Sequence, residues 1–369
     1  MPFILCLGDS NGSVIASNIF EGGCSKITLV SNSMVIDESF GEEEILPAAL
    51  NIFGPACENI TLLAGSMLNK FEETCCNILV GIYAIGNTFG AWIDTLVMMG
   101  FNCFNLIGGR ALEVSLGYGS SYNTLGEIAL YCNLGNNCEY NIIEYNCSQI
   151  TLGDNCEHNV FESFCSRNSL GNDCAYNLFK LLCGSNTLAD DCSYNLLDEN
   201  CSNNIFGESC MGNVLREGNY SNEFKNKCQL NTLGAQSSYN FFDQNSSLNV
   251  FGFNCGQNRL EQGLNLYNTF GDFCLSNKLV AANSYNTFES SCIGNTIPAN
   301  FSNCIFKSGV KNTKLENNAG YDYNRPVSIE ISSGIKGNST SNQKVISITE
   351  TREIPLIYRA AETTEIILD

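Results

Sequence analysis

Asparagine, large apolar residues and cysteine recur along this chain with a period of nine residues. The unit reads Asn, any residue, a large apolar residue, often Gly, two polar residues, Cys and two further residues. It is clearest at Asn168–Cys174 and returns at 177–183, 186–192 and 204–210. The period is kept from Asn51 to Cys304, apart from one extra residue near Gly263. Such a fixed short period predicts a protein built from stacked repeats.

The first part of the array indicates the size of one structural coil. Between Asn51 and Asn123 the asparagine position is filled alternately by Asn and by Ile, Leu or Val, so two nonapeptides form one coil of 18 residues. A position that accepts these aliphatic residues faces inward, and so does the apolar residue two positions later. The cysteine position also faces inward, because it accepts Ala84, Ile93, Ala111, Ala129 and Leu264.

Stacked coils place equivalent asparagines about 4.8 Å apart. At that distance each side-chain amide can donate to the next one, which satisfies polar groups that would otherwise be buried without a partner. An α-helical repeat is excluded, because apolar residues do not recur at three and four and Gly and Asn are frequent. We predict an all-β parallel β-solenoid. Its predicted core rows include Asn168, Asn177, Asn186, Asn195, Asn204, Cys174, Cys183, Cys192, Cys201 and Cys210.

The repeat predicts three segments. Residues 1–50 fit the period poorly and are interpreted as first coils and a cap, residues 51–318 as the array, and residues 319–369 as a small β module. Alternating residues at 327–331, 345–348 and 354–358 predict ordinary strands in that module. Because the outer positions of the array are read as polar and acidic, we expect the module to cap the last coil or to hold copies of the chain together.

The position after the large apolar residue differs between the two halves of the coil. In one half it holds Gly135, Gly153 and Gly171, which predicts a turn or a positive φ. In the other half it holds Glu144, Glu162, Lys180, Asp198 and Arg216, which we interpret as a solvated edge that discourages strand pairing.

Charge and cysteine usage narrow the possible partners and the compartment. The formal net charge is −20, which argues against nucleic acid and anionic membranes, and no apolar run is long enough to span a membrane. Most of the 21 cysteines occupy the inward position. We expect free thiols and folding in a reducing compartment, and the N-terminus does not have the pattern of a signal peptide.

A search for catalytic chemistry gives no candidate. His158 is the single histidine and lies at a predicted corner, the cysteines follow the repeat rather than zinc-site spacing, and no phosphate-binding loop is present. Paired carboxylates could cleave glycans, but Asp190, Asp191 and the acidic residues 42–44 are explained as turn residues. We expect no catalytic, cofactor or metal site. Trp92, the single tryptophan, is expected at a turn, as a contact residue or as filler of a surface groove.

The Asn-Thr-Phe-Gly and Asn-Thr-Leu-Gly units at Asn87, Asn123, Asn231 and Asn268 resemble the repeat arrays of fibre proteins of tailed phages. The likeness covers roughly residues 51–369 and is greatest to crAss-like phages of gut Bacteroidetes, whose repeats often have Phe where this chain has Cys. It implies a tail or head fibre, usually a homotrimer, assembled in the host cytoplasm.

These observations favour a non-enzymatic structural fibre or host-attachment component of a phage virion. Expected partners are further copies of the chain, other virion proteins, and a host-surface glycan or protein as receptor. A polysaccharide-degrading tailspike and a bacterial surface adhesin are the alternatives. A tailspike requires a groove with close carboxylates, whereas an adhesin requires an export route.

Overall fold

The computed structural model describes residues 4–7, 18–30, 34–37, 42–45, 50–261, 263–280, 283–297, 304–307, 309–310, 313–315, 327–331, 336–339, 346–347, 352–356 and 366–368. These residues form strands and turns and no helix, and accordingly none of them belongs to a helix that could cross a membrane. The chain divides into two compact units, Met1–Asn186 and Thr187–Asp369. We call them unit 1 and unit 2.

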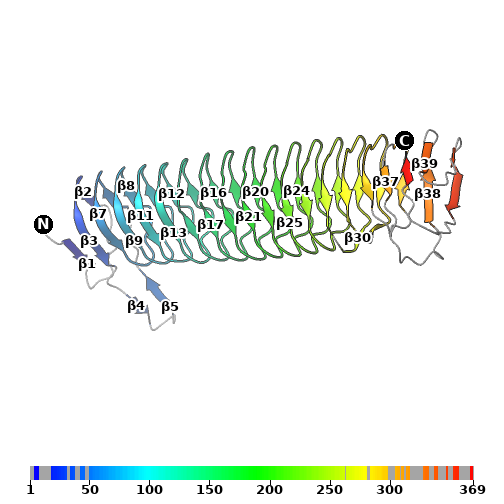
Figure 1. Cartoon of the computed structure of the whole chain (residues 1–369). Coiled ribbons are helices and arrows are strands. Elements are labelled where there is room, and N and C mark those ends of the chain that lie inside the picture. Colours follow the sequence, from blue (N-terminus) through cyan, green and yellow to red (C-terminus); the bar gives the residue numbers. More distant parts are fainter. Residues whose placement is uncertain are drawn as a thin grey trace. The chain divides into compact units, whose positions relative to one another are not determined.

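Unit 1 is a parallel β-solenoid, as the sequence predicts, with two ladders of strands that run along the stack of coils (Figure 1). The first ladder contains β1 (Ile4–Leu7), β3 (Ser25–Val30), β7 (Glu58–Leu62), β9 (Cys76–Val80), β11 (Asp94–Met98), β13 (Leu112–Leu116), β15 (Asn133–Leu134), β17 (Thr151–Leu152) and β19 (Ser169–Leu170). The second contains β2 (Ile19–Phe20), β6 (Ile52–Phe53), β8 (Lys70–Phe71), β10 (Thr88–Phe89), β12 (Leu106–Ile107), β14 (Thr124–Leu125), β16 (Ile142–Ile143), β18 (Val160–Phe161) and β20 (Leu178–Phe179). An antiparallel hairpin pairs β4 (Met34–Asp37) with β5 (Glu42–Ile45).

Unit 2 repeats the same arrangement. Its first ladder contains β21 (Thr187–Leu188), β23 (Ile205–Phe206), β25 (Glu223–Phe224), β27 (Phe241–Phe242), β29 (Arg259–Leu260), β32 (Lys278–Leu279), β35 (Thr296–Ile297) and β37 (Thr313–Leu315). Its second contains β22 (Leu196–Leu197), β24 (Val214–Leu215), β26 (Thr232–Leu233), β28 (Val250–Phe251), β31 (Thr269–Phe270), β34 (Thr287–Phe288) and β36 (Ile305–Phe306). A separate short pair joins β30 (Asn265–Leu266) and β33 (Asn283–Ser284).

The residue at the asparagine position decides how long a strand is. Where this position is aliphatic in successive coils, as at Ile60 and Ile78, the two residues pair and the strands are five residues long. Where it is asparagine, as at Asn123, its backbone N–H donates to Oδ1 of Asn141 in the next coil at 2.9 Å. The side-chain oxygen replaces a main-chain carbonyl, so pairing begins one residue later and the strand is two residues long.

The corners of the coils lie at two left-handed residues in each nonapeptide. One precedes the asparagine position, as at Tyr140 with φ 54°, and the other precedes the cysteine position, as at Asn137 with φ 55°. Most of these corner residues are not glycine. The prediction of positive φ at Gly135, Gly153 and Gly171 is wrong, since none of the three has it.

These glycines are required for a different reason, which is the close approach of the preceding coil. A Cβ on Gly153 would lie 1.9 Å from Asn136 Oδ1 and 2.8 Å from Asn136 N. Asn136 Oδ1 is held there because it accepts a hydrogen bond from Asp154 N at 3.0 Å.

We expect Gly153→Ala to lower the free energy of unfolding by about 1–3 kcal/mol, because the preceding coil must shift to admit the methyl group. Gly256→Ala is the matched control, since the nearest atom to its added Cβ is Leu275 O at 3.2 Å. Chemical unfolding of both variants measures the difference. Equal losses in the two variants would mean that close coil contact does not select glycine at Gly153.

Two irregularities in the period are absorbed without breaking the stack. Asn18 and Asn51 are 33 residues apart, yet Asn18 Nδ2 donates to Asn51 Oδ1 at 2.8 Å, and the segment between them contains the β4–β5 hairpin. The extra residue near Gly263 makes one coil 19 residues long, as in the bond from Asn249 to Asn268.

The assignment of Leu264 to the inward cysteine position is wrong. Leu264 is 57% exposed, whereas Asn265 is fully buried. The extra residue lies before the cysteine position of this nonapeptide rather than after it. The inward residue is therefore Asn265 instead of Leu264.

The C-terminal segment contains five described strands: β38 (Val327–Ile331), β39 (Lys336–Ser339), β40 (Ile346–Ser347), β41 (Arg352–Leu356) and β42 (Ile366–Leu368). β38 pairs with β41, and β42 pairs with both β37 and β39, in each case antiparallel. The remainder of the predicted module at 319–369 lies outside the described residues. Segment boundaries at 50 and 318, and a capping or oligomerisation role for this module, stay predictions.

Candidate functional surface

The predicted core asparagines are engaged in the stack and are not available to a ligand. Asn168, Asn177, Asn186, Asn195 and Asn204 are all buried. Asn168 Nδ2 donates to Asn186 Oδ1 at 3.0 Å in unit 1, and Asn204 Nδ2 donates to Asn222 Oδ1 at 3.0 Å in unit 2. Their amides therefore hold coil to coil.

The predicted core cysteines Cys174, Cys183, Cys192, Cys201 and Cys210 are buried and do not form disulfides, as is the case for most of the described cysteines. Cys174 Sγ donates to Gly153 O at 3.2 Å, in the preceding coil. Asn219, which occupies the same position, donates from Nδ2 to Asp198 O at 3.0 Å. The position thus favours a small side chain that can donate a hydrogen bond.

Thiol reactivity should separate the surface from the interior. Cys24, Cys76 and Cys103 are the half-buried thiols among the described residues, whereas the others are buried. We expect a maleimide to modify these three in the folded protein and all 21 cysteines after denaturation without reductant. Burial raises the pKa of Cys76, so its labelling should accelerate at higher pH, because the thiolate is the nucleophile.

Mass spectrometry of the intact chain reads both results. Extensive labelling of the buried positions under native conditions would contradict the packed interior. Unmodified cysteines after denaturation would contradict the free thiols.

The outer surface of unit 1 has a feature that the predicted sites do not include. Five corner residues stack on one another in successive coils, and we call them the aromatic row: Phe104, Tyr122, Tyr140, His158 and Tyr176. Their ring centroids are 4.8–5.2 Å apart, with interplanar angles of at most 16°. Phe104 is 63% exposed. The rings cover one another's faces, so the row offers its edges to solvent.

His158 therefore has a structural place in this row. Its ring lies 4.8 Å from Tyr140 and 5.2 Å from Tyr176. Trp92 also lies at a corner and is half-exposed, with the guanidinium of Arg110 4.5 Å above its ring. This cation–π contact lies within the chain, so a role of Trp92 as a contact residue for a partner stays a prediction.

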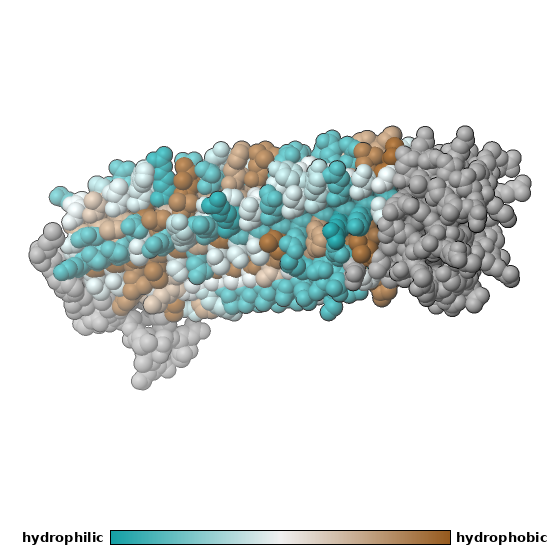
Figure 2. Space-filling view, in the orientation of Figure 1, coloured by the Kyte–Doolittle hydropathy of each residue, from teal (hydrophilic) through white to brown (hydrophobic). Residues whose placement is uncertain are grey.

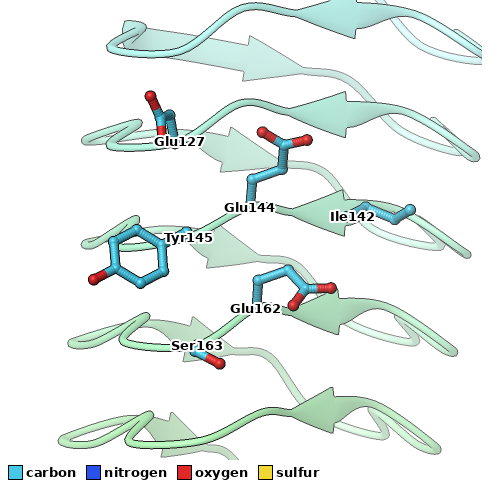
Figure 3. A pocket seen from close by; sticks show the side chains of 6 residues that line it. All are labelled: Glu127, Ile142, Glu144, Tyr145, Glu162 and Ser163. Atoms are coloured by element: carbon cyan, nitrogen blue, oxygen red, sulfur yellow. The ribbon is translucent and has the colours of Figure 1, made fainter.

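A shallow open depression of about 430 Å³ lies on the outer surface of unit 1. It is lined by Glu127, Ile142, Glu144, Tyr145, Glu162 and Ser163. Glu144 points along the stack toward the coil of Glu127, and Tyr145 points outward from the turn (Figure 3). Glu162 Oε1 forms an ion pair with Lys180 Nζ at 2.5 Å. The carboxylates can accept hydrogen bonds from hydroxyl groups of a ligand. The neighbouring tyrosine ring can cover an apolar face of the same ligand.

The other acidic residues singled out in the sequence lie elsewhere. Asp190 Oδ1 accepts a hydrogen bond from Glu208 N at 2.7 Å, which is a turn role. Residues 42–44 belong to β5, so their interpretation as turn residues is wrong. Among the residues that the structure describes, no three His, Cys, Asp or Glu side chains converge as metal ligands.

The aromatic row was missed because the sequence was compared at a nine-residue spacing. Tyr122, Tyr140 and Tyr176 precede alternate asparagines, and the intervening residues are Tyr131, Gln149 and Arg167. A comparison at 18 residues would have separated the two series.

No protein-family model matches the sequence, and no curated protein sequence matches it either. Among solved structures, the chain is similar to a mutant tailspike protein of the E. coli bacteriophage HK620 in complex with a pentasaccharide. The identity is 9%, the match covers 99% of this chain and 84% of that chain, and the TM-score is 0.26. PfbA, a surface adhesin of Streptococcus pneumoniae, gives 9% identity over 86% and 90% with a TM-score of 0.18. At these values the likeness carries no argument about function.

Proposed function

We propose that this chain is a non-enzymatic structural component of a phage virion, a tail or head fibre that takes part in host attachment. The observation that carries the proposal is the division between interior and surface. The same inward positions are filled coil after coil by hydrogen-bonded asparagines, apolar side chains and thiols, whereas the outward residues vary. Such a stack provides a scaffold, and its specific contacts belong to its outer surface.

The depression around Glu144 is the surface feature best suited to a receptor. Tyr145 is 48% exposed and lies beside Glu127 and Glu144. An aromatic ring next to hydrogen-bond acceptors suits a sugar or a polar protein loop. The proposed receptor is a host-surface glycan or protein, and the proposed assembly is a homotrimer formed with other virion proteins in the host cytoplasm. Free thiols support assembly in a reducing compartment.

Competition for host cells tests the attachment role. Purified protein, incubated with the host of the phage that encodes it, should reduce adsorption of that phage in a dose-dependent way. The variant Tyr145→Ala should compete less well, while Tyr131→Ala, an equally exposed tyrosine on another corner, should compete like the unmodified chain. Adsorption unaffected by excess protein would refute the attachment role.

The polysaccharide-degrading tailspike is favoured by one observation, the three carboxylates of Glu127, Glu144 and Glu162 at one depression. Incubation with host surface polysaccharide and measurement of new reducing ends separates the two functions. We expect no release of reducing ends. Release that disappears in Glu144→Gln would establish the tailspike function instead.

A further inference from the structure

One side of the coils between residues 59 and 123 has no charged residue, in a chain whose net charge is −20. The segments 59–69, 77–87, 95–105 and 114–123 contain no Asp, Glu, Lys or Arg. They are the equivalent parts of four successive coils, because Ile60 pairs with Ile78, Ile78 with Leu96, and Leu96 with Val114. The uncharged segments therefore lie side by side.

This side also exposes large apolar side chains. Eleven of them are 37–63% exposed, and we call them the apolar side: Leu63, Leu68, Ile82, Tyr83, Ile85, Val97, Met99, Phe101, Phe104, Tyr118 and Tyr122. The expectation that the outer positions of the array are polar and acidic is wrong here. It arose because outward residues from both halves of the coil were read together.

Two corners of the coil contribute rings to the apolar side. At one corner, Tyr83 stacks on Phe101 with centroids 5.4 Å apart, and Phe101 meets Tyr118 edge-on at 5.4 Å. At the next corner, Phe104 stacks on Tyr122 at 5.1 Å. These contacts hold the rings in fixed positions, so little side-chain freedom remains to be lost when a partner covers them. Hydrophobic patches between hydrophilic rows are visible on the face drawn in Figure 2.

The size of the apolar side matches a protein interface. A fully covered aromatic side chain buries about 150–250 Å², so eleven half-exposed apolar side chains offer on the order of 1,000 Å². A stable interface needs about 800 Å² from each partner. Exposed apolar patches of this size mark interaction sites in soluble proteins.

We propose that the apolar side is the surface through which copies of this chain associate with one another. A second copy fits better than another partner for two reasons, the position of the acidic residues and the spacing of the outward side chains. The acidic residues of the same coils, such as Glu72, Glu73 and Asp94, lie outside the uncharged segments. Copies that meet through the apolar side therefore keep those carboxylates in water.

A second copy also reproduces the spacing of the surface. Its outward side chains recur at the same strand spacing, about 4.8 Å, so ridges on one copy meet grooves on the other along several coils. An uncharged surface also meets an identical surface without repulsion between like charges. This inference concerns the contact surface and does not depend on the proposal that the chain belongs to a virion.

The test is the oligomeric state of the full chain, measured by sedimentation velocity. The unmodified chain is expected to sediment as a multiple of 40.3 kDa. The double variant Tyr83→Asn with Phe101→Asp is expected to sediment as a monomer. Asn and Asp tolerate the left-handed conformation of these corners, and Asn137 and Asp173 occupy the same corner in later coils with φ 55° and 57°. The variant should keep the circular dichroism of the unmodified chain.

Tyr131→Asp is the matched control, because Tyr131 is 57% exposed and has φ 56° but lies outside the uncharged segments. It should assemble like the unmodified chain. A double variant that folds and stays assembled would overturn the proposal and assign the contact to another segment, such as residues 319–369. A monomeric unmodified chain would also overturn the proposal. Binding of that monomer to neutral phosphatidylcholine vesicles would assign the apolar side to a membrane surface instead.

Discussion

Replacing Asn141 by aspartate is expected to lower the free energy of unfolding by about 3–5 kcal/mol, the cost of a buried charge without a partner. Asn141 is fully buried. Its Nδ2 donates to Ser120 O at 2.9 Å and to Asn159 Oδ1 at 3.0 Å. A carboxylate at that place loses both donors and faces two oxygen acceptors. Protonating it to avoid the charge also costs free energy at neutral pH.

Leucine at two different asparagine positions provides the matched comparison. Asn141→Leu leaves the backbone N–H of Asn123 without its acceptor and Ser120 O without the donor Nδ2 of Asn141, at about 1–3 kcal/mol for each buried group. Asn168→Leu leaves only the backbone N–H of Ile150 without its acceptor. The equivalent residue of the preceding coil, Ile150, is already aliphatic and buried.

We therefore expect the order of destabilisation to be Asn141→Asp, then Asn141→Leu, then Asn168→Leu. Equilibrium unfolding in urea at pH 7 measures it. If Asn141→Asp were as stable as Asn168→Leu, the asparagine position would not be a buried hydrogen-bonded site, and the coil arrangement would have to be revised.

The second large effect is a loss of stability in alkali. Burial raises the pKa of Cys132 and Cys304 from the ordinary value of 9.0 to about 11. Below pH 9 these thiols are protonated in both the folded and the unfolded chain, so they leave stability unchanged. Between pH 9 and 11 the unfolded chain releases their protons while the folded chain retains them. Stability therefore falls as pH rises through this window, by up to about 2–3 kcal/mol for each thiol.

Cys132→Val isolates this contribution from that of other groups titrating in alkali. Val114 already fills the equivalent place in the preceding coil, so the substitution suits the row, and both residues are buried. Between pH 9 and 11 the free energy of unfolding of the variant should fall less than that of the unmodified chain. Below pH 8.5 the two free energies should depend on pH in nearly the same way. Parallel stability curves for the two proteins across this range would show that the Cys132 thiol does not titrate with a raised pKa.

The interior of this protein could be predicted from the sequence because inward positions are chosen by the same demand in every coil. Asn168 and Cys174 occupy buried places for the reasons that their spacing indicates. The glycine at Gly153 could not be interpreted correctly, because its role depends on how closely the preceding coil approaches. Spacing along the chain does not contain that distance.

The outer surface was harder to predict because a nine-residue comparison superposes two different sides of the coil. Phe104 and Tyr122 lie on one corner and Glu113 and Tyr131 on another. When these series are read together, the exposed rings look scattered among polar residues. Separated by coil geometry, they form the aromatic row and part of the apolar side. The functional candidates of this chain belong to that surface.

Electron microscopy of intact phage particles, labelled with gold-conjugated antibody fragments raised against the purified chain, tests the proposed function most directly. The proposal predicts gold on appendages of the head or tail, and reduced adsorption of the labelled particles to host cells. Intact particles without gold, in a preparation whose infected-cell lysate contains the protein, would contradict a place in the virion.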